Sequence, residues 1–214
     1  MTEVIVVRHG ETDWNVEGRI QGHQESDLNA RGRAQARAVG ERFRGERTAV
    51  VYSSDLRRAL DTAGPIAKAL GVEVRSDVRL REWHLGCIET MLLEEARTRE
   101  PDAARIYDER DPDAVVPGGE SICQRHARCT ECLMEIADVH AGSRVVVVTH
   151  GGILDDFYRF VSGVAQSVDR EWDLFNCGIN RLRTDGERWW VDAWGDIEHL
   201  DGIGSMADWN EEGQ

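Results

Sequence analysis

The stretch Val4-Ile5-Val6-Val7-Arg8-His9-Gly10-Glu11-Thr12 sets a short hydrophobic run directly before a polar turn. Its four apolar residues do not alternate with polar ones, which predicts a strand buried on both faces, as in a parallel sheet covered by helices. Two further runs have the same character, at residues 49–52 and 145–148. We therefore predict three buried strands that share one sheet.

Helical patterns connect these strands. Apolar residues recur at helical spacing over about 30–43, 56–70, 121–139 and 153–161. Asn29 is suited to cap the first of these helices and Asp55 the second, whereas Pro65 is expected to kink or shorten the second. The alternation of strands and helices predicts an α/β fold, a three-layer α/β/α sandwich with a mainly parallel central sheet.

The last part of the chain departs from this alternation. Residues 180–184 and 188–194 flank Asp185-Gly186, a pair typical of a hairpin turn. Earlier in the chain, a polar stretch with two prolines indicates a helical insertion over about 90–117. No linker or internal repeat divides the sequence, so we expect one domain over 1–214 with an acidic C-terminal tail over about 196–214.

The charge balance excludes two broad classes of partner. The 214 residues include 26 Lys and Arg against 40 Asp and Glu, a formal net charge of −14. Such an acidic protein is not expected to bind nucleic acid, whose phosphate backbone selects basic surfaces, nor an anionic membrane surface. A net charge does not describe local fields, so a small anionic ligand stays compatible with the sequence.

The protein is expected to be cytoplasmic. Its first residues lack the basic segment of a signal peptide, and no stretch approaches the roughly 18 consecutive apolar residues of a membrane span. Its five cysteines, an odd number, suit a compartment in which thiols stay reduced.

Four residues at three-residue intervals raise the question of a metal site: Cys123, His126, Cys129 and Cys132. In a helix each three-residue step turns by about 300°, so the side chains drift by about 180° over three steps. Cys123 and Cys132 would then point to opposite sides and could not share one tetrahedral zinc ion. We expect no metal site, and we place Cys129 and Cys132 on the core face of the helix.

Polar residues suited to phosphate chemistry follow each buried strand. The first strand runs into Arg8 and His9, the second into a segment ending at Arg57 and Arg58, and the third into His150. Ligands of an open parallel sheet gather outside the carboxyl ends of its strands. Each of these residues alone would be an ordinary turn or surface residue. Together they combine guanidinium groups, which match phosphate oxygens, with imidazoles, which can attack phosphorus.

The turn after the first strand, with Trp14 and Asn15 beyond it, resembles the signature of the histidine phosphatase superfamily, whose fold is phosphoglycerate mutase-like. The resemblance continues in order along nearly the whole chain. The matching segments are Gly18-Arg19-Ile20-Gln21-Gly22, Ser53-Ser54-Asp55-Leu56-Arg57-Arg58-Ala59, Leu80-Arg81-Glu82, Pro117-Gly118-Gly119-Glu120-Ser121, Thr149-His150-Gly151-Gly152 and Glu198-His199-Leu200.

The resemblance implies a role for each candidate site residue. His9 would attack phosphorus to form a phosphohistidine, while Arg8, Arg58 and His150 grip the phosphoryl oxygens. Glu82 would protonate the leaving oxygen and later deprotonate the attacking water. No metal and no cofactor is implied, since the arginines and a histidine supply the positive charge. The remaining substrate-binding residues that the resemblance implies are Asn15, Gln21 and Gly151.

The segment that carries Glu82 is the least regular of these matches. Residues 87–90 depart from the family's pattern, which leaves the shape of the leaving-group pocket open. Glu82 itself could instead be a surface carboxylate paired with Arg79 or Arg81. The adjoining Trp83-His84 pair is a candidate for contact with the leaving group.

Two outcomes follow from the same first chemical step. A phosphatase gives the phosphoryl group to water, whereas a phosphoglycerate mutase returns it to another hydroxyl of the bound substrate. Family mutases carry a longer segment after the acid, and the short stretch from Glu82 to Gly118 favours an open, water-accessible site. We therefore predict a metal-independent phosphatase, with a mutase as the alternative.

A third hypothesis is an inactive domain that binds a phosphorylated ligand or a protein. It is disfavoured because His9, Arg58 and His150 are all present. The predicted partner is a small phosphorylated metabolite, hydrolysed as a phosphomonoester. The sequence leaves a homodimer open, because it does not separate an interface from a core.

Overall fold

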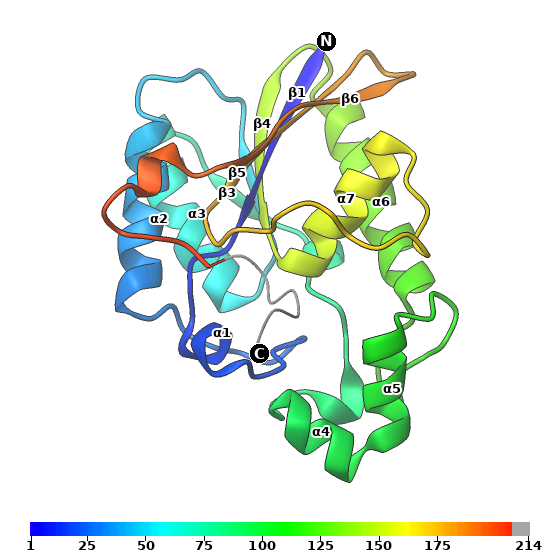
Figure 1. The fold of residues 1–214 in the computed structure, drawn as a ribbon. Helices are drawn as coiled ribbons and strands as arrows, with labels where there is room; N and C mark the ends of the chain where they lie inside the picture. The colour runs from blue at the N-terminus through cyan, green and yellow to red at the C-terminus, as the bar shows by residue number, and fades with distance from the viewer. Residues whose placement is uncertain (207–214) are drawn as a thin grey trace.

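The structure, a computed structural model, describes residues 1–206 (Figure 1). The strands are β1 (Thr2–Arg8), β2 (Val51–Ser53), β3 (Val74–Ser76), β4 (Arg144–Thr149), β5 (Ile179–Thr184) and β6 (Trp189–Asp196). The α-helices are α1 (Asp13–Glu17), α2 (Ala30–Arg42), α3 (Arg57–Leu70), α4 (Leu93–Arg99), α5 (Pro101–Glu109), α6 (Ile122–Val139) and α7 (Gly151–Ser162). Short 3-10 helices are η1 (Val78–Leu80), η2 (Gly86–Ile88) and η3 (Glu198–Leu200).

The strands form one six-stranded sheet in the order β3-β2-β4-β1-β5-β6. Strands β3, β2, β4 and β1 are mutually parallel, while β5 runs antiparallel to both β1 and β6. The predicted hairpin is therefore the β5–β6 pair. Strands β1 and β4 lie in the middle of the sheet, which explains their unbroken apolar runs, because helices cover both of their faces.

Alternate residues of β1 point to opposite faces of the sheet, and each face has its own hydrophobic core. Val4 and Val6 belong to a cluster with Leu133 of α6 and with residues of α7. Ile5 and Val7 belong to a second cluster formed with α2 and α3. Figure 1 shows these two helix pairs on opposite sides of the sheet. The predicted three-layer α/β/α sandwich is confirmed.

Of the two predicted N-cap residues, one is confirmed and one is wrong. Asn29 caps α2, since its side chain accepts a hydrogen bond from the Gly32 amide at 2.8 Å. The prediction that Asp55 caps α3 is wrong, because Leu56 is the capping residue and makes no side-chain hydrogen bond. The carboxylate of Asp55 pairs with Arg81 instead, at 2.6 Å, a partner that local sequence does not reveal.

Pro65 lies inside α3, and the expectation that it shortens this helix is wrong, while the alternative of a kink stays a prediction. The helix runs through Pro65 and ends at Leu70. A proline ring normally collides with the Cβ of the residue before it when that residue is helical. Here the preceding residue is Gly64, which has no Cβ.

Residues 90–117, where the sequence predicts a helical insertion, contain α4 and α5. Pro101 is the first residue of α5, a position at which its missing amide hydrogen costs nothing. A third hydrophobic cluster, which includes Trp83, Ile88 and Ala104, packs this part of the chain together. In Figure 1, α4 and α5 extend beyond the end of the sheet that holds the carboxyl ends of the parallel strands.

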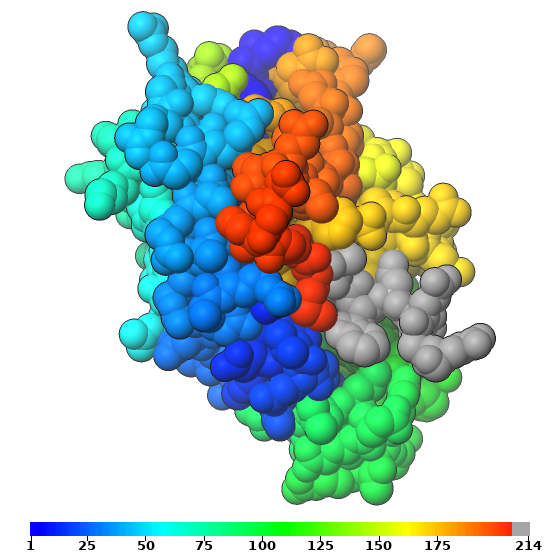
Figure 2. All heavy atoms as spheres, turned by 60° about the vertical axis from the view of Figure 1, so that its left-hand side comes forward, coloured from blue at the N-terminus to red at the C-terminus, as the bar shows by residue number. Residues whose placement is uncertain are grey.

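The segment after β6 passes across α2, as the contact between blue and red residues in Figure 2 shows. Gln35 of α2 donates a side-chain hydrogen bond to the Gly204 carbonyl at 2.8 Å. The predicted acidic tail over 196–214 begins in this segment. Its last part, 207–214, lies outside the described residues.

Cys129 and Cys132 are fully buried beside Leu133 in α6, as predicted. All five cysteines of the sequence are free thiols. Within residues 1–206, no group of three or more His, Cys, Asp or Glu side chains is arranged to hold a metal ion. The same part of the chain contains no helix long and apolar enough to cross a membrane.

Candidate active site

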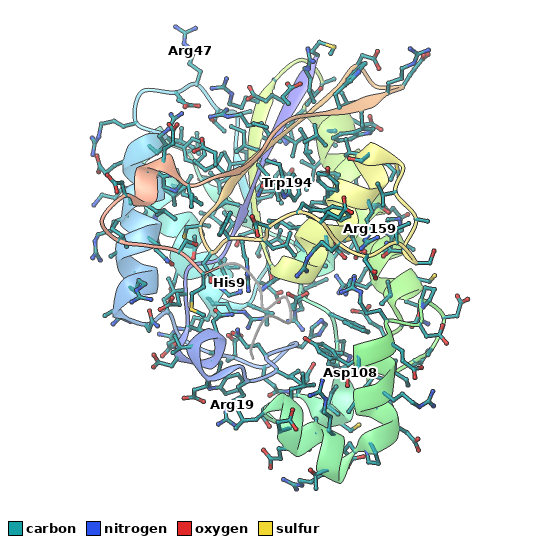
Figure 3. All side chains as sticks on the ribbon, viewed as in Figure 1. His9, Arg19, Arg47, Asp108, Arg159 and Trp194 are labelled. Atoms are coloured by element: carbon teal, nitrogen blue, oxygen red, sulfur yellow. The ribbon has the colours of Figure 1, made fainter. Side chains whose placement is uncertain are left out.

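The carboxyl ends of β1, β2 and β4 meet at one edge of the sheet, and the candidate site lies there. The parallel register pairs Arg8 with Thr149, so the residues after both strands emerge side by side. The His9 amide donates to the Thr149 carbonyl at 2.9 Å. As a result the rings of His9 and His150 lie close together, tilted by 57° with 5.2 Å between their centroids. Figure 3 shows His9 at this edge of the sheet.

The His9 side chain is held as a neutral imidazole of defined tautomer. Its Nδ1 lies 2.8 Å from the Gly10 carbonyl oxygen, which can only accept, so Nδ1 carries the hydrogen. The Nε2 atom then has a free lone pair. Burial lowers the pKa of His9 well below its usual value, and the positive charges of Arg58 and Arg8 lower it further. The neutral, nucleophilic form is therefore favoured.

The turn that carries His9 is fixed by its backbone. The Gly10 amide donates to the Thr62 hydroxyl at 3.0 Å, and Asn176 donates to the His9 carbonyl at 2.9 Å. A Cβ on Gly10 would lie 2.6 Å from the Gly32 carbonyl oxygen, which shows how closely the start of α2 approaches this turn. Gly10 is therefore required because no side chain fits between this turn and the start of α2.

Two buried arginines flank His9. Arg58 is fully buried, and its Nη1 and Nη2 atoms donate to the carbonyls of Gln24 and Gly22, each at 2.8 Å. Burial lowers the pKa of Arg58 to about 10, although the nearby Glu82 charge opposes this shift. Arg8 is 4% exposed and donates from Nη1 to the Leu174 carbonyl. With a pKa of about 10, Arg58 remains positively charged at neutral pH.

His150 is fully buried and precedes α7 as its N-cap residue. Among the described residues, neither of its ring nitrogens has a hydrogen-bond partner. Burial lowers the pKa of His150 well below its usual value, and the charge of Arg58 adds to this effect. Buried polar atoms are normally satisfied, so the unpartnered nitrogens of His150 indicate a ligand-binding position. Gly151 follows as the first residue of α7, where backbone amides favour anions.

Glu82 reaches the same edge of the sheet from the loop after η1. Its Oε1 accepts from the Trp83 amide at 2.7 Å, and its Oε2 accepts from the Gly152 amide of α7 at 3.1 Å. The alternative that Glu82 pairs with Arg79 or Arg81 is wrong. Those arginines are engaged elsewhere, at 2.7 Å from Asp77 and 2.6 Å from Asp55 respectively.

Asn15 and Gln21 are joined through Thr12. Asn15 forms a capping box with Thr12 at the start of α1, where its Oδ1 accepts from the Thr12 amide at 3.1 Å. The Thr12 hydroxyl lies 3.2 Å from Gln21 Oε1, which also accepts from Ser26 at 2.5 Å. Because both amide oxygens are used in this way, the NH₂ group of each side chain is left as the donor for a ligand.

The Trp83-His84 pair has two different roles in the structure. Trp83 is 4% exposed, and its ring stacks on Tyr107 of α5 with 5.8 Å between centroids. It therefore packs the insertion against the loop that carries Glu82. His84 is more exposed and stacks on His23 at 4.5 Å, and the His23 ring lies 2.7 Å from the Glu82 carbonyl oxygen.

Sequence reasoning missed two polar residues of this region, Asn176 and Arg125. Asn176 supports the His9 carbonyl from 167 residues away, and buried Arg125 contributes positive charge in the neighbourhood of Glu82. Neither residue lies in a segment that the sequence marks as functional. Their positions depend on tertiary contacts alone.

The assembled site combines a neutral imidazole, two buried guanidinium groups, a second imidazole and a carboxylate. Such a set can bind a phosphoryl dianion and stabilise the charge that develops on its oxygens during transfer. The fold and the site together define a protein of the phosphoryl-transfer class.

Comparisons with known proteins agree with this class. The family model of the histidine phosphatase superfamily (branch 1) matches residues 4–197. A phosphoglycerate mutase-like protein 4 from Arabidopsis thaliana is 43% identical over 95% of this chain and 89% of its own length. A metal-independent phosphoserine phosphatase from the same plant is 41% identical over 96% of this chain and 86% of its own length.

A solved structure extends the likeness to three dimensions. A variant of phosphoserine phosphatase from Entamoeba histolytica, in complex with phosphoserine, superposes with a TM-score of 0.83 and 26% identity. The match covers 94% of this chain and 100% of that one. The chain belongs to the histidine phosphatase superfamily. The predicted family and the predicted class of enzyme, a phosphatase, are confirmed.

Proposed function

We propose that the protein hydrolyses a small phosphomonoester through a phosphohistidine on His9, without a metal ion. The observation that carries this proposal is the state of His9. Its Nδ1 hydrogen is bound to the Gly10 carbonyl, and its unprotonated Nε2 belongs to a ring that lies 5.2 Å, between centroids, from the ring of His150. A buried neutral imidazole with a fixed tautomer is an activated nucleophile.

In the first half-reaction, His9 Nε2 attacks phosphorus while the bond to the leaving oxygen breaks. Arg8, Arg58 and His150 hold the equatorial oxygens and stabilise their charge. Glu82, in its protonated form, gives its proton to the leaving oxygen, so that an alcohol departs. The Trp83 and Gly152 amides then hold the resulting carboxylate, since both already donate to it. Asn15, Gln21 and the Gly151 amide would bind the remaining substrate oxygens.

In the second half-reaction, water attacks the phosphohistidine. Glu82 takes a proton from that water, the bond between nitrogen and phosphorus breaks, and inorganic phosphate leaves. His9 returns to the neutral form, which the low pKa of this side chain favours. The cationic groups supply the charge stabilisation that a metal ion supplies in other phosphoryl-transfer enzymes.

We expect the substrate to be a small phosphorylated metabolite with an alcohol leaving group. Two relatives support this size and chemistry, because both are named for action on phosphoserine. The acidic exterior supports it as well, since a net charge of −14 disfavours large polyanions such as nucleic acid. A panel of phosphoserine, 3-phosphoglycerate and sugar phosphates, assayed for phosphate release without metal, would identify the best substrate.

The test of the mechanism is a trapping experiment. Incubation with a labelled phosphomonoester and rapid quenching should yield protein carrying an acid-labile, base-stable phosphate on His9. The His9→Ala variant should lose both the label and more than about 99% of phosphate release, because the nucleophile is absent. Phosphate release that survives this substitution would refute the assignment.

Two further measurements separate the other hypotheses, a mutase and an inactive domain. With 3-phosphoglycerate, a mutase would form 2-phosphoglycerate rapidly with little inorganic phosphate. An inactive domain would bind vanadate, a phosphoryl mimic, yet release no phosphate from any substrate in the panel. We expect phosphate as the main product.

We propose the cytoplasm as the compartment of this protein. Five free thiols suit the reducing cytoplasm. A homodimer is left open by the sequence, and light scattering of the purified protein would decide it.

A further inference from the structure

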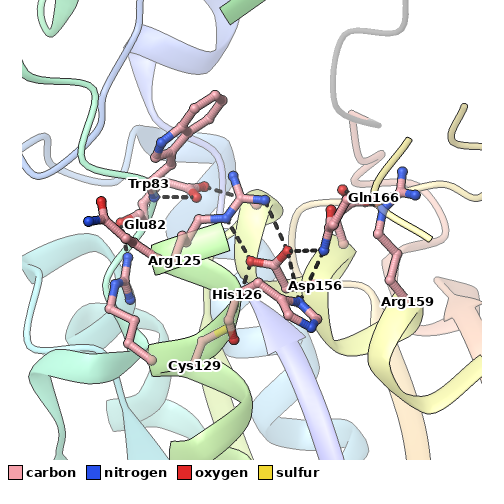
Figure 4. Close-up of polar contacts among 12 residues, drawn as sticks. Glu82, Trp83, Arg125, His126, Cys129, Asp156, Arg159 and Gln166 are labelled. Carbon is pink, nitrogen blue, oxygen red and sulfur yellow. Dashed lines mark hydrogen bonds and ion pairs between the residues drawn. The ribbon is translucent and has the colours of Figure 1, made fainter. Parts of the chain in front are cut away.

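A buried ion pair lies behind Glu82, between α6 and α7 (Figure 4). Arg125 of α6 donates from Nε and Nη2 to the two carboxylate oxygens of Asp156 of α7, at 2.6 and 3.1 Å. Both side chains are essentially inaccessible, at 1% and 0% exposure. The Trp83 ring covers the guanidinium, with 5.0 Å between Cζ and the ring centroid. Arg125 is therefore held in one orientation.

The nitrogen that Asp156 does not use lies beside Glu82. A Cβ on Gly152 would be 2.4 Å from Glu82 Oε1 and 3.0 Å from Arg125 Nη1. The Glu82 carboxylate and the Arg125 guanidinium therefore both border the same small space beside Gly152. The same measurement explains the second glycine of the His150-Gly151-Gly152 turn. Any side chain at position 152 would occupy the space in which the carboxylate and the guanidinium meet.

We propose that Arg125 is a positioning residue for Glu82, which fixes its carboxylate and stabilises the negative charge that forms when Glu82 gives its proton to the leaving oxygen. The inference rests on the proposed function, because it assigns Glu82 the role of general acid. Arg125 does not contact the phosphoryl group in this scheme. It acts on the reaction only through Glu82.

The proposed role predicts that the effect of losing Arg125 depends on the leaving group of the substrate. As the bond between phosphorus and the leaving oxygen breaks, the oxygen takes the Glu82 proton and the carboxylate becomes an anion. A basic leaving group needs this proton in the transition state, whereas a nitrophenolate leaves without much help. Support for Glu82 should therefore matter for poor leaving groups and little for good ones.

A purely structural role for Arg125 predicts something different. The Arg125–Asp156 pair joins α6 to α7, and its loss could loosen the packing of both helices. Such damage would lower the rates of all substrates alike. The dependence of the rate on the leaving group is thus the readout that separates the two roles.

The experiment compares phenyl phosphate with p-nitrophenyl phosphate, which share a ring and differ in the leaving group. In Arg125→Gln, we expect kcat/KM to fall about 30-fold for phenyl phosphate and less than about 3-fold for p-nitrophenyl phosphate, within the usual range for general acid catalysis. Glu82→Gln should show the same pattern more strongly. Adding Arg125→Gln to Glu82→Gln should cause no further selective loss, because the two residues act as a unit.

The matched control is an arginine on α7, one helical turn beyond Asp156. Arg159 is also a buried arginine paired with an aspartate, at 3.1 Å from Asp155, and it holds the carbonyls of Ala165 and Val168. Arg159→Gln should therefore affect both phenyl esters equally. A selective loss in this control would overturn the specific role of Arg125.

A second variant protects the test against misfolding. Arg125→Gln removes the guanidinium partner of buried Asp156, which keeps contacts with Gln166, His126 and Cys129. Arg125→Met combined with Asp156→Leu instead replaces the whole ion pair by apolar side chains, which the sites of buried ion pairs often tolerate. The double variant should be folded and should show the same selective loss. Equal losses for both esters in a folded variant would overturn the inference, while an unmodified protein inactive on both would instead refute the proposed function.

Discussion

Mild acidification should destabilise this protein through His9 and His150 in particular. Both imidazoles are buried, and their pKa values lie well below the usual 6.5 because of burial and of neighbouring positive charges. The folded protein therefore keeps both rings neutral at a pH at which the unfolded chain protonates them. The stability present above pH 6.5 is lost as the pH falls towards the lower folded pKa values.

The size of this effect follows from proton linkage. Between pH 6.5 and 5.5, a histidine with an unfolded pKa of about 6.5 that stays neutral in the folded state removes about 1 kcal/mol from the free energy of unfolding. His9 and His150 together should remove about 2 kcal/mol, a large part of the total stability of a typical domain.

The assay is urea denaturation at the two pH values, followed by tryptophan fluorescence in a buffer free of phosphate. The double variant His9→Asn with His150→Asn should lose about 2 kcal/mol less than the unmodified protein over this pH interval. The double variant keeps every other ionisable side chain, so the contributions of those groups cancel in the comparison. Equal pH dependence in the two proteins would refute the reasoning.

A ligand provides a second check on the same prediction. Vanadate in the proposed site would bring negative charge to both imidazoles and favour their protonation. Saturating vanadate should therefore reduce the pH dependence of the unmodified protein and leave the double variant unchanged.

Three further predictions concern packing, charge and reactivity. Gly32→Ala should lower the free energy of unfolding by about 1–3 kcal/mol in urea, because the new Cβ would lie 2.0 Å from the Glu11 carbonyl oxygen; an unchanged value would contradict the close contact. Arg58→Lys should lower kcat/KM about 100-fold in a phosphate-release assay, since an ammonium cannot match the planar grip on two oxygens; a change below threefold would remove Arg58 from the mechanism. Iodoacetamide at pH 8, followed by mass spectrometry, should label the exposed Cys123 before the buried Cys129, Cys132 and Cys177, whose pKa values burial raises; early labelling of the buried thiols would show that this core opens.

The sequence predicts the sheet well because its central strands carry an unusually plain signal. A run such as Val4 to Val7 has few alternatives to a strand that is buried on both faces. Once three such strands are parallel, the residues that follow them must share one edge, which places His9, Arg58 and His150 together. The gathering of these residues is therefore a consequence of topology that sequence pattern can supply.

Other features depend on contacts that no local pattern encodes. Asp55 has the sequence position of a helix cap, yet Arg81 is only 26 residues away and competes for its carboxylate. Arg125 meets Asp156 across 31 residues and two helices. In both cases the deciding partner is brought in by tertiary folding, so an argument from neighbouring residues selects the wrong role or none.

The hydrogen bond between His9 Nδ1 and the Gly10 carbonyl has a consequence for the evolution of this site. In many enzymes a carboxylate side chain orients the catalytic histidine, and one mutation can remove it. Here the acceptor is a main-chain oxygen next to the histidine itself, at 2.8 Å. No substitution at another position deletes that atom, so the surrounding loops can change in sequence while the orientation of the proposed nucleophile, His9, is kept.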